Sequence, residues 1–279
     1  MNKNIKVGFF GTPEYAVIVL EKLKTAGFDV AFVLTNPDRP QGRKMLVTPP
    51  PAKVWAESNG VAVLQPETLK SAELEETLKA FGCDVFVVMA YGKIIPESIL
   101  NIPKGKTLNI HPSLLPKFRG PSPIESAILA DEKNTGVTIM RLDREMDHGP
   151  IIAQKEATIE TWPPKAHELG TLLVTEGADL LISILPDWMD GKIQEKEQDH
   201  SQATFCKMIK KEDGLIDLSD DAYKNFLKIR AYDGWPSAYF MKDGKRVKVV
   251  EASHTDGVLT LLEVVPEGRN KMLYQDFLR

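Results

Sequence analysis

The stretch NIHPSLLPKFRG, residues 109–120, decides how the rest of this chain is interpreted. Asn109 and His111 end the apolar run 107–111, and residues two apart on a β-strand point to the same face of a sheet. Pro112 has no backbone N–H and keeps His111 extended, so we expect the strand to end there. An amide and an imidazole therefore emerge side by side at the carboxyl end of a strand, where open α/β sheets place their active sites.

The segment after this stretch is expected to be a loop leading into a helix. Residues 122–125, SPIE, have the pattern of a capping box with proline at the first helical position. We therefore expect a helix over residues 122–130, capped by Ser122 and Glu125.

Length and composition limit the class of protein. A chain of 279 residues is long for one core, so we expect one large and one small domain. The net charge of -4 gives no overall attraction to nucleic acid, so an RNA partner would have to be held by local patches. The two cysteines, Cys83 and Cys206, have no CxxC spacing, which argues against a zinc site or a disulfide framework and favours a reducing cytoplasm. No apolar run approaches the roughly 18 residues of a membrane helix, so no membrane partner is expected.

The first two thirds of the chain alternate between strand and helix patterns. Apolar runs at 5–10 and 29–35 flank a helical stripe that Thr12 is expected to cap, and Ser71 is expected to cap another helix. Further buried strands are expected at 84–90 and 136–142. This pattern predicts an α/β fold, a Rossmann-like N-terminal domain with a mostly parallel sheet. The turn GFFGTPE lacks both phosphate-loop patterns, so nucleotide binding is not favoured.

The last third has a different composition. A long amphipathic helix is expected over 165–185, followed by polar residues that are poor in aliphatic side chains. Short alternating segments then occur at 238–241, 246–251 and 258–264, and Asp243-Gly244 is a type I′ hairpin signal. We therefore expect a catalytic domain over 1–188, a linker over 189–204 and a small β-rich, OB-like domain over 205–279.

Residues 36–51, NPDRPQGRKMLVTPPP, form a long segment that is rich in proline. Five prolines and Gly42 are expected to prevent regular structure, and Arg39, Arg43 and Lys44 make the segment basic. A loop of this length is usually functional or disordered, and a solvated surface excursion is an equally good interpretation.

The polar residues near the central stretch can handle protons. A histidine titrates near neutrality, an asparagine amide can donate to a developing oxyanion, and an aspartate such as Asp147 can orient an imidazole and favour its protonated form. No serine or cysteine stands in a nucleophile elbow, so these groups suit direct acyl transfer to an amine. Without further context, a lone histidine on a strand is more often structural, and an aspartate in a loop is usually a solvated turn residue.

The apolar loop after the strand at 84–90 has two possible roles. Tyr91-Gly92-Lys93-Ile94-Ile95-Pro96 could line a pocket for a flat heterocycle. Alternatively, Ile94 and Ile95 pack into the core, and the residues alone favour this second interpretation.

NIHPSLLPKFRGPSP, followed by MDHGP around Asp147, resembles the signature of the 10-formyltetrahydrofolate-dependent formyltransferases. Within that superfamily the chain is similar to the methionyl-tRNA formyltransferases along nearly all its length. The segments that match in order are FFGTPEYAV, TNPDRPQGR, PPPAKVWAE, VVMAYGKIIP, RGPSPIESAIL, GVTIMRLDREMDHGPI, IRAYDGWPSAY and PEGRNKMLYQDFLR.

The resemblance implies transfer of the formyl group of 10-formyltetrahydrofolate to the amino group of initiator methionyl-tRNA, in translation initiation. It implies a catalytic trio of Asn109, His111 and Asp147. We also expect no metal, and a monomer. The basic residues that would contact the tRNA are Arg39, Arg43 and Lys44. The residues that would bind the folate are Met89, Ala90, Tyr91, Gly92, Ile94, Ile95, Pro96, Ser113, Leu114, Leu115 and Pro116.

The C-terminal part departs from the family that it resembles. The family has a C-terminal barrel, and this chain is short of about two strands, so we expect a reduced barrel. A sugar-nucleotide N-formyltransferase with the same trio and cofactor is the alternative function, and a non-catalytic RNA-binding relative is a third. GWPSAY and PEGRNKM favour the tRNA enzyme, and the intact trio argues against a non-catalytic protein.

Overall fold

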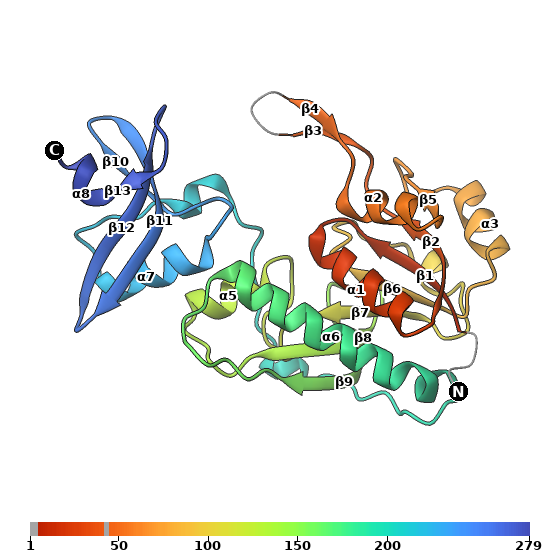
Figure 1. Ribbon diagram of the computed structural model, residues 1–279. Coiled ribbons are helices and arrows are strands. Elements are labelled where there is room, and N and C mark those ends of the chain that lie inside the picture. The colour runs from red at the N-terminus through yellow and green to blue at the C-terminus, as the bar shows by residue number, and fades with distance from the viewer. Residues whose placement is uncertain (1–4, 42–44) are drawn as a thin grey trace. The chain divides into compact units, whose positions relative to one another are not determined.

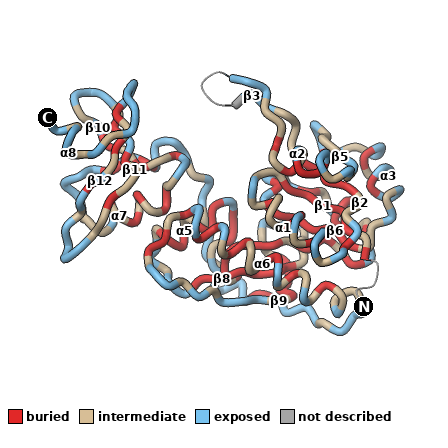
Figure 2. Tube along the Cα trace, in the orientation of Figure 1, coloured by how far each residue is buried: buried red, intermediate tan, exposed pale blue. Residues whose placement is uncertain are grey.

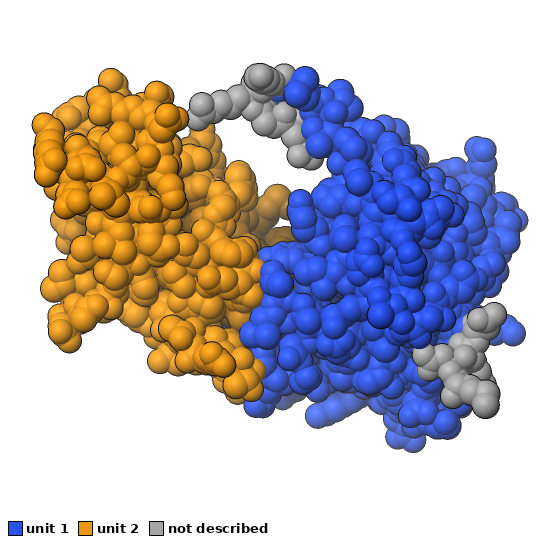
Figure 3. All heavy atoms as spheres, viewed as in Figure 1, with its two compact units in different colours: residues 1–119, 136–157, 171–204 blue, residues 120–135, 158–170, 205–279 orange. Residues whose placement is uncertain are grey.

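The computed structural model describes residues 5–41 and 45–279. The chain forms two compact units, which are coloured separately in Figure 3. Unit 1 comprises Met1–Arg119, Gly136–Ala157 and Thr171–Thr204, and unit 2 comprises Gly120–Thr135, Thr158–Gly170 and Phe205–Arg279. The domain limits 1–188, 189–204 and 205–279 stay a prediction, while the two units interleave along the chain.

Unit 1 is built on a seven-stranded sheet of order β5-β2-β1-β6-β7-β8-β9. The first five strands in this order are parallel. β8 then pairs antiparallel with β7, and β9 pairs antiparallel with β8. The strands are β1 (Lys6–Gly11), β2 (Asp29–Leu34), β5 (Ala62–Leu64), β6 (Val85–Met89), β7 (Thr107–His111), β8 (Gly136–Arg141) and β9 (Ile151–Glu156). The predicted Rossmann-like domain with a mostly parallel sheet is confirmed (Figure 1).

Helices cover both faces of this sheet. Their bounds are α1 (Glu14–Thr25), α2 (Pro51–Ser58), α3 (Ala72–Ala80), α4 (Glu97–Leu100) and α6 (Ala166–Met189). Residues of α1, α2 and α6 share one hydrophobic cluster with Val7 and Phe9, whereas residues of α3 and α4 share another with Phe10. Because side chains alternate along a strand, these clusters lie on opposite faces of the sheet. The buried strands between the helix layers are seen in Figure 2.

Helix α6 is longer than the sequence predicts. The expected helix ended at residue 185, yet α6 continues to Met189 with Pro186 inside it. The side chain of Trp188 donates a hydrogen bond to the Gly105 carbonyl, 2.8 Å away. This contact holds the last turn of the helix against the turn that precedes β7. This tertiary contact outweighs the local preference of proline to end a helix.

Helix α6 is also long and apolar enough to cross a membrane by length and composition alone. Its Val174, Leu181 and Leu185 are fully buried in the cluster that includes the strand residues of the sheet. A core helix of a soluble protein passes the same test of length and composition.

Three expected helix caps have different outcomes. Ser71 caps α3 as predicted, because its hydroxyl accepts from the Leu74 amide at 3.3 Å. The expected cap by Thr12 is wrong, since Pro13 holds the N-cap position of α1 and the Thr12 hydroxyl instead accepts from the Asn36 amide at 3.1 Å. The expected cap by Ser122 is also wrong, because this hydroxyl donates to the carbonyl of Lys207 at 2.5 Å.

The basic segment 36–51 contains regular structure, contrary to the prediction. Strands β3 (Arg39–Gln41) and β4 (Leu46–Thr48) pair as an antiparallel ribbon. Every strand of a two-stranded ribbon is an edge strand, so the missing N–H of Pro40 is tolerated.

Unit 2 contains an antiparallel sheet of four strands in the order β10-β11-β12-β13. Its elements are α5 (Pro123–Leu129), η2 (Lys211–Gly214), α7 (Ala222–Ala231), β10 (Tyr239–Lys242), β11 (Lys245–Thr255), β12 (Val258–Pro266), β13 (Met272–Leu273) and α8 (Tyr274–Phe277). Helix α7 packs on β11 and β12, and Ile229, Phe240, Val249 and Val264 form part of the buried core. The predicted small β-rich unit is confirmed (Figure 1).

Two tight hairpins connect the long strands of this sheet. The predicted turn at Asp243-Gly244 has φ angles of 50° and 72° and joins β10 to β11. Asp256-Gly257, with φ angles of 51° and 78°, joins β11 to β12 in the same way, although the sequence analysis did not single it out. Positive φ at both central residues is the mark of a type I′ turn.

Candidate active site

Strand β7 places Asn109 and His111 as the sequence predicts. Leu108 and Ile110 of this strand belong to the cluster with α1 and α6, so Asn109 and His111 point to the opposite face of the sheet. Asn109 lies beside Val88 of β6, and His111 lies opposite Thr138 of β8. Both side chains therefore lie at the carboxyl end of β7, on the face of the sheet opposite α1 and α6.

The imidazole of His111 is buried, with 4% of its side chain exposed, and has a partner on each side. Its Nε2 lies 2.9 Å from the carbonyl oxygen of Phe118. Since a carbonyl can only accept, Nε2 must carry a hydrogen. The other nitrogen, Nδ1, faces Oδ1 of Asp147 at 3.6 Å, which is longer than a hydrogen bond. The nitrogen that can exchange a proton with a substrate is therefore Nδ1.

Asp147 lies in the connection between β8 and β9. Its side chain is 13% exposed, and its backbone is left-handed, with a φ of 49°. Such a conformation is uncommon outside glycine, although asparagine and aspartate adopt it more readily than other residues, and the carboxylate faces His111. The structure thus brings together two of the three residues that the resemblance implies for catalysis.

Asn109 completes the trio on the same strand face as His111. Its side chain is half-buried, and its amide makes no hydrogen bond within residues 5–41 and 45–279. An amide in this position can donate to a bound substrate without first breaking a contact in the protein.

The loop that follows β7 is held by residues that the sequence analysis missed. The hydroxyl of Thr138 donates to the Ser113 carbonyl at 2.7 Å and accepts from the Leu115 amide at 3.1 Å. The amide of Gln154 donates to the Leu115 carbonyl at 2.8 Å. A polar residue at an inward position of β8 is the signal that could have indicated this role. Leu115 itself packs in a small cluster with Met140, whereas Leu114 and Pro116 are half-buried.

The loop after β6 divides between core and surface. Met89, Tyr91 and Ile95 are buried, and the Met89 side chain belongs to the cluster on the face opposite Asn109. Burial raises the pKa of Tyr91 to about 12, so its phenol stays neutral. In the same loop Ala90, Gly92 and Ile94 are exposed, and the φ of Ala90 is 50°. Ile94 is 82% exposed, so only Ile95 packs into the core as the alternative interpretation expected, while Pro96 is half-buried.

The basic residues expected to contact tRNA are described only in part. Arg39 is exposed on β3 of the ribbon, while Arg43 and Lys44 lie outside the described residues. Next to them, Met45, Leu46 and Val47 are 66%, 63% and 67% exposed.

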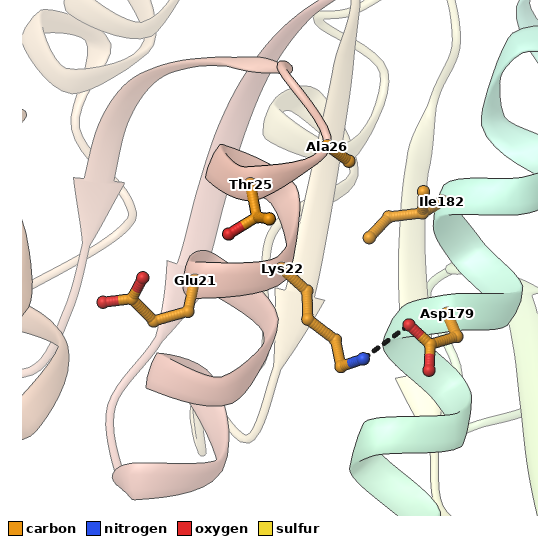
Figure 4. A pocket seen from close by; sticks show the side chains of 6 residues that line it. All are labelled: Glu21, Lys22, Thr25, Ala26, Asp179 and Ile182. Atoms are coloured by element: carbon orange, nitrogen blue, oxygen red, sulfur yellow. Dashed lines mark hydrogen bonds and ion pairs between the residues drawn. The ribbon is translucent and has the colours of Figure 1, made fainter.

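A hollow of about 290 Å³ lies between α1 and α6 and is lined by Glu21, Lys22, Thr25, Ala26, Asp179 and Ile182 (Figure 4). An ion pair of 2.6 Å between Lys22 and Asp179 crosses it. None of the residues singled out as catalytic, folate-binding or tRNA-binding lines this hollow, so we do not assign the chemistry to it.

Comparisons with known proteins show which family this chain resembles. Residues 3–185 match the family described as formyl transferase, and residues 208–257 match the formyl transferase C-terminal domain. A methionyl-tRNA formyltransferase from Chloroflexus aggregans is 49% identical over 251 residues, which cover 89% of this chain and 80% of that protein. A methionyl-tRNA formyltransferase from Herpetosiphon aurantiacus is 39% identical over 299 residues, covering 99% of this chain and 97% of that protein.

Structural similarity extends over most of the chain. A methionyl-tRNA formyltransferase from Clostridium thermocellum has a TM-score of 0.64 at 16% identity and covers 94% of this chain and 98% of that one. At this identity the likeness concerns the fold alone. The span of 299 aligned positions exceeds the 279 residues of this chain by 20, so the Herpetosiphon relative carries at least 20 residues that this chain lacks. Because a family match covers more than half of the sequence and a relative matches it along its full length, the chain belongs to the formyl transferase family.

Proposed function

We propose that this chain transfers the formyl group of 10-formyltetrahydrofolate to the amino group of initiator methionyl-tRNA. The observation that carries the proposal is the pair of His111 and Asp147, 3.6 Å apart, with the unengaged amide of Asn109 on the same strand face. The names of the relatives supply the acceptor, and the site supplies groups that suit acyl transfer to an amine.

The chemistry of transfer needs an oxyanion donor and a proton acceptor. Bound 10-formyltetrahydrofolate would supply an activated formyl carbon to the attacking amine. The amide of Asn109 would donate to the formyl oxygen, where negative charge develops, and a preorganised donor of this kind typically contributes 100- to 1,000-fold in rate. His111 Nδ1 would take a proton from the attacking amine and return one to N10 of the folate as the bond between the formyl carbon and N10 breaks, so that tetrahydrofolate leaves with a neutral nitrogen. Nε2 would stay fixed on the Phe118 carbonyl.

Asp147 would act through His111. A carboxylate 3.6 Å from Nδ1 stabilises positive charge on the ring while the ring holds a proton. The gap is too long for a direct hydrogen bond and leaves Nδ1 accessible to a water molecule or to the substrate. We infer that protons pass between the amine, His111 and Asp147 by this route.

The loop after β6 fits a folate in its chemistry. Its exposed apolar Ile94 and the backbone of Ala90 and Gly92 offer a surface for a flat ring and polar groups for its edges.

Ile94→Ser should weaken binding of the folate about three- to tenfold, because one apolar contact of about 1 kcal/mol is lost. The melting temperature should stay within about 1 °C, since an exposed side chain contributes little to stability. Equal folate affinity in the variant, measured by calorimetry, would remove this loop from the pocket.

The exposed ribbon β3–β4 is proposed to contact the tRNA through Arg39, Arg43 and Lys44. A partner of this size requires a protruding, basic element, because the chain as a whole has a net charge of -4. We propose that the protein works in the cytoplasm as a monomer and takes part in translation initiation.

The test is a comparison of acceptors. The purified chain with 10-formyltetrahydrofolate should formylate methionyl-tRNA at least 100-fold faster than an amino-sugar nucleotide, with product detected by mass spectrometry of the released amino acid. Faster formylation of the amino sugar would replace the proposed acceptor and leave the formyl-transfer chemistry standing. Absence of transfer to either acceptor would overturn the proposed function.

A further inference from the structure

Gln198 makes contacts that the proposed reaction does not explain. It lies in the polar segment after α6 and is 4% exposed. Its Nε2 donates to the carbonyl of Asp147 at 2.9 Å and to that of Gly149 at 2.7 Å. Its Oε1 accepts from Nε and Nη2 of Arg119, at 3.0 and 2.7 Å. Both donor hydrogens and both lone pairs of the amide are thereby used.

Arg119 links this amide to the other side of His111. It follows Phe118, whose carbonyl accepts from His111 Nε2. Thr204, in the same segment as Gln198, holds both Phe118 and Arg119. Its hydroxyl accepts from the Phe118 amide at 2.8 Å, and its backbone carbonyl accepts from the Arg119 amide at 2.9 Å. The segment from Gln198 to Thr204 therefore contacts both neighbours of the His111 ring.

A pair of stacked histidines extends the same connection. Nη2 of Arg119 donates to Nδ1 of His200 at 2.8 Å, and the His200 ring stacks on His148 with centroids 4.1 Å apart. Nδ1 of His148 lies 2.8 Å from Oδ2 of Asp143. His148 is the residue directly after Asp147. These contacts therefore hold the side chain next to Asp147, in addition to the backbone of Asp147 itself.

The backbone at both neighbours of His111 requires such support. Asp147 and Phe118 have φ angles of 49° and 59°, in the left-handed region that non-glycine residues rarely adopt. Strained conformations of this kind persist only where the surrounding structure holds them. The carbonyl of Asp147 is held by Gln198, and the amide of Phe118 is held by Thr204.

We propose that Gln198 is a positioning residue of the active site, which holds the Asp147 carboxylate against His111 by fixing the Asp143–Pro150 connection. This inference rests on the proposed function of the trio. It assigns a role in catalysis to a segment that the sequence indicated only as a linker. Because a displacement of about 1 Å at a reacting group can reduce a rate about 100-fold, loss of this contact should be visible in turnover.

The test is a double-mutant cycle on formyl transfer. Gln198→Met keeps the size of the side chain and removes its polar atoms, and it should lower kcat at least tenfold with KM for the folate within about threefold. In an Asp147→Asn background the same change should cost less than about twofold, because Gln198 then has no carboxylate to position. Equal losses in both backgrounds, or a kcat within twofold of wild type, would overturn the proposal.

Two further variants separate positioning from folding. Gln202→Met is a matched control, because Gln202 lies in the same segment and is exposed, and its kcat should be unchanged. Gln198→Glu keeps an acceptor for Arg119 and removes the donor to the connection. If Gln198→Met does not fold, Gln198→Glu takes its place in the double-mutant cycle, and the same changes in kcat support or overturn the proposal.

A measurement without substrate distinguishes this proposal from the proposed function. In Gln198→Met the amides of residues 143–149 should exchange hydrogen at least tenfold faster, while those of β7 keep their rate. Unchanged exchange in the connection would overturn the proposal even if activity fell. If the wild-type chain transferred no formyl group, the proposed function would fail, whereas the exchange rates would still decide whether Gln198 holds the connection.

Discussion

The surroundings of His111 and the ribbon β3–β4 differ in how unit 1 holds the side chains for which we propose a function. Around His111 the side chains are buried and each ring nitrogen has a fixed neighbour. On the ribbon Arg39 is exposed, and the apolar residues Met45, Leu46 and Val47 are also mostly exposed. The described contacts hold the ribbon at its root and leave its side chains in solvent.

The root of the ribbon is held by one carboxylate. Asp38 accepts from Nζ of Lys53 at 2.8 Å and from Nε2 of Gln65 at 2.7 Å. These hydrogen bonds, that of Gln65 first, lower the pKa of Asp38. The difference teaches that proton transfer needs atoms fixed to a fraction of an ångström, whereas contact with a large acceptor needs reach and charge.

The largest expected effect concerns the buried region. Asn109→Ala, His111→Ala and Asp147→Ala should each lower kcat about 100- to 1,000-fold, because a preorganised donor or its support is lost. Folate affinity should stay within about tenfold in single-turnover and binding measurements. Near-normal turnover of His111→Ala would break the comparison, since the buried region would then not be the catalytic one.

The next effect comes from crowding the connection that carries Asp147. A methyl group at Gly149 would overlap the carbonyl oxygen of Arg141. Gly149→Ala should therefore lower kcat at least tenfold and cost about 1–3 kcal/mol of unfolding free energy. Gly191→Ala is the control, because its φ of 71° costs about 1–2 kcal/mol at a position with open space around it. Equal losses of kcat in both variants would point to stability rather than position.

The ribbon should affect binding rather than turnover. Each phosphate contact on a single strand contributes about 0.7 to the slope of log affinity against log salt. Replacing Arg39, Arg43 and Lys44 by alanine should flatten this slope for methionyl-tRNA by about 2, with kcat at saturating tRNA within about threefold. An unchanged slope would place the phosphate contacts elsewhere, and a loss of kcat as large as that of His111→Ala would remove the distinction between the two regions.

The smallest expected effect concerns the root of the ribbon. Because the folded pKa of Asp38 is lowered, its stabilising contribution is present above the ordinary value of 3.8 and is lost as the pH falls through the folded pKa. Asp38→Asn should thus increase proteolytic cleavage within residues 39–48 at pH 7 by a few-fold. In hydrogen exchange of the same residues, the difference from wild type should shrink as the pH falls below 3.8 and vanish only below the lowered pKa of Asp38. A difference that persists in acid would exclude ionisation of Asp38 as its cause.

Local patterns were sufficient for most of the secondary structure. Alternation and apolar runs predicted the parallel strands, and Asp243-Gly244 predicted a hairpin. The cap by Ser71 was predicted because its partner lies three residues away. The errors at Thr12 and Ser122 have one cause: each hydroxyl bonds a group distant in the sequence, which no local pattern reports.

The candidate site likewise contains residues that local patterns predict and residues that only distant contacts place. The spacing of Asn109 and His111 was enough to place both on one strand face, because alternation is a local property of a strand. Asp147 was connected to them only by resemblance, and the structure brings its carboxylate to 3.6 Å from the ring. Gln198 gave no signal, since polar residues in a linker have many ordinary roles, and the only signal at Thr138 was a polar residue at an inward position of β8.

The sequence by itself determined the α/β order of the N-terminal part, the β-rich end and the pair of side chains on β7, because all three follow from the periodicity of neighbouring residues. Only the tertiary structure decided that Gly120–Thr135 and Thr158–Gly170 form one compact unit with Phe205–Arg279. Within that unit the Asp131 carboxylate accepts from Tyr223 at 2.9 Å and from Trp162 at 2.6 Å. Such contacts join residues far apart in the chain, and their energy depends on where the backbone has already been placed.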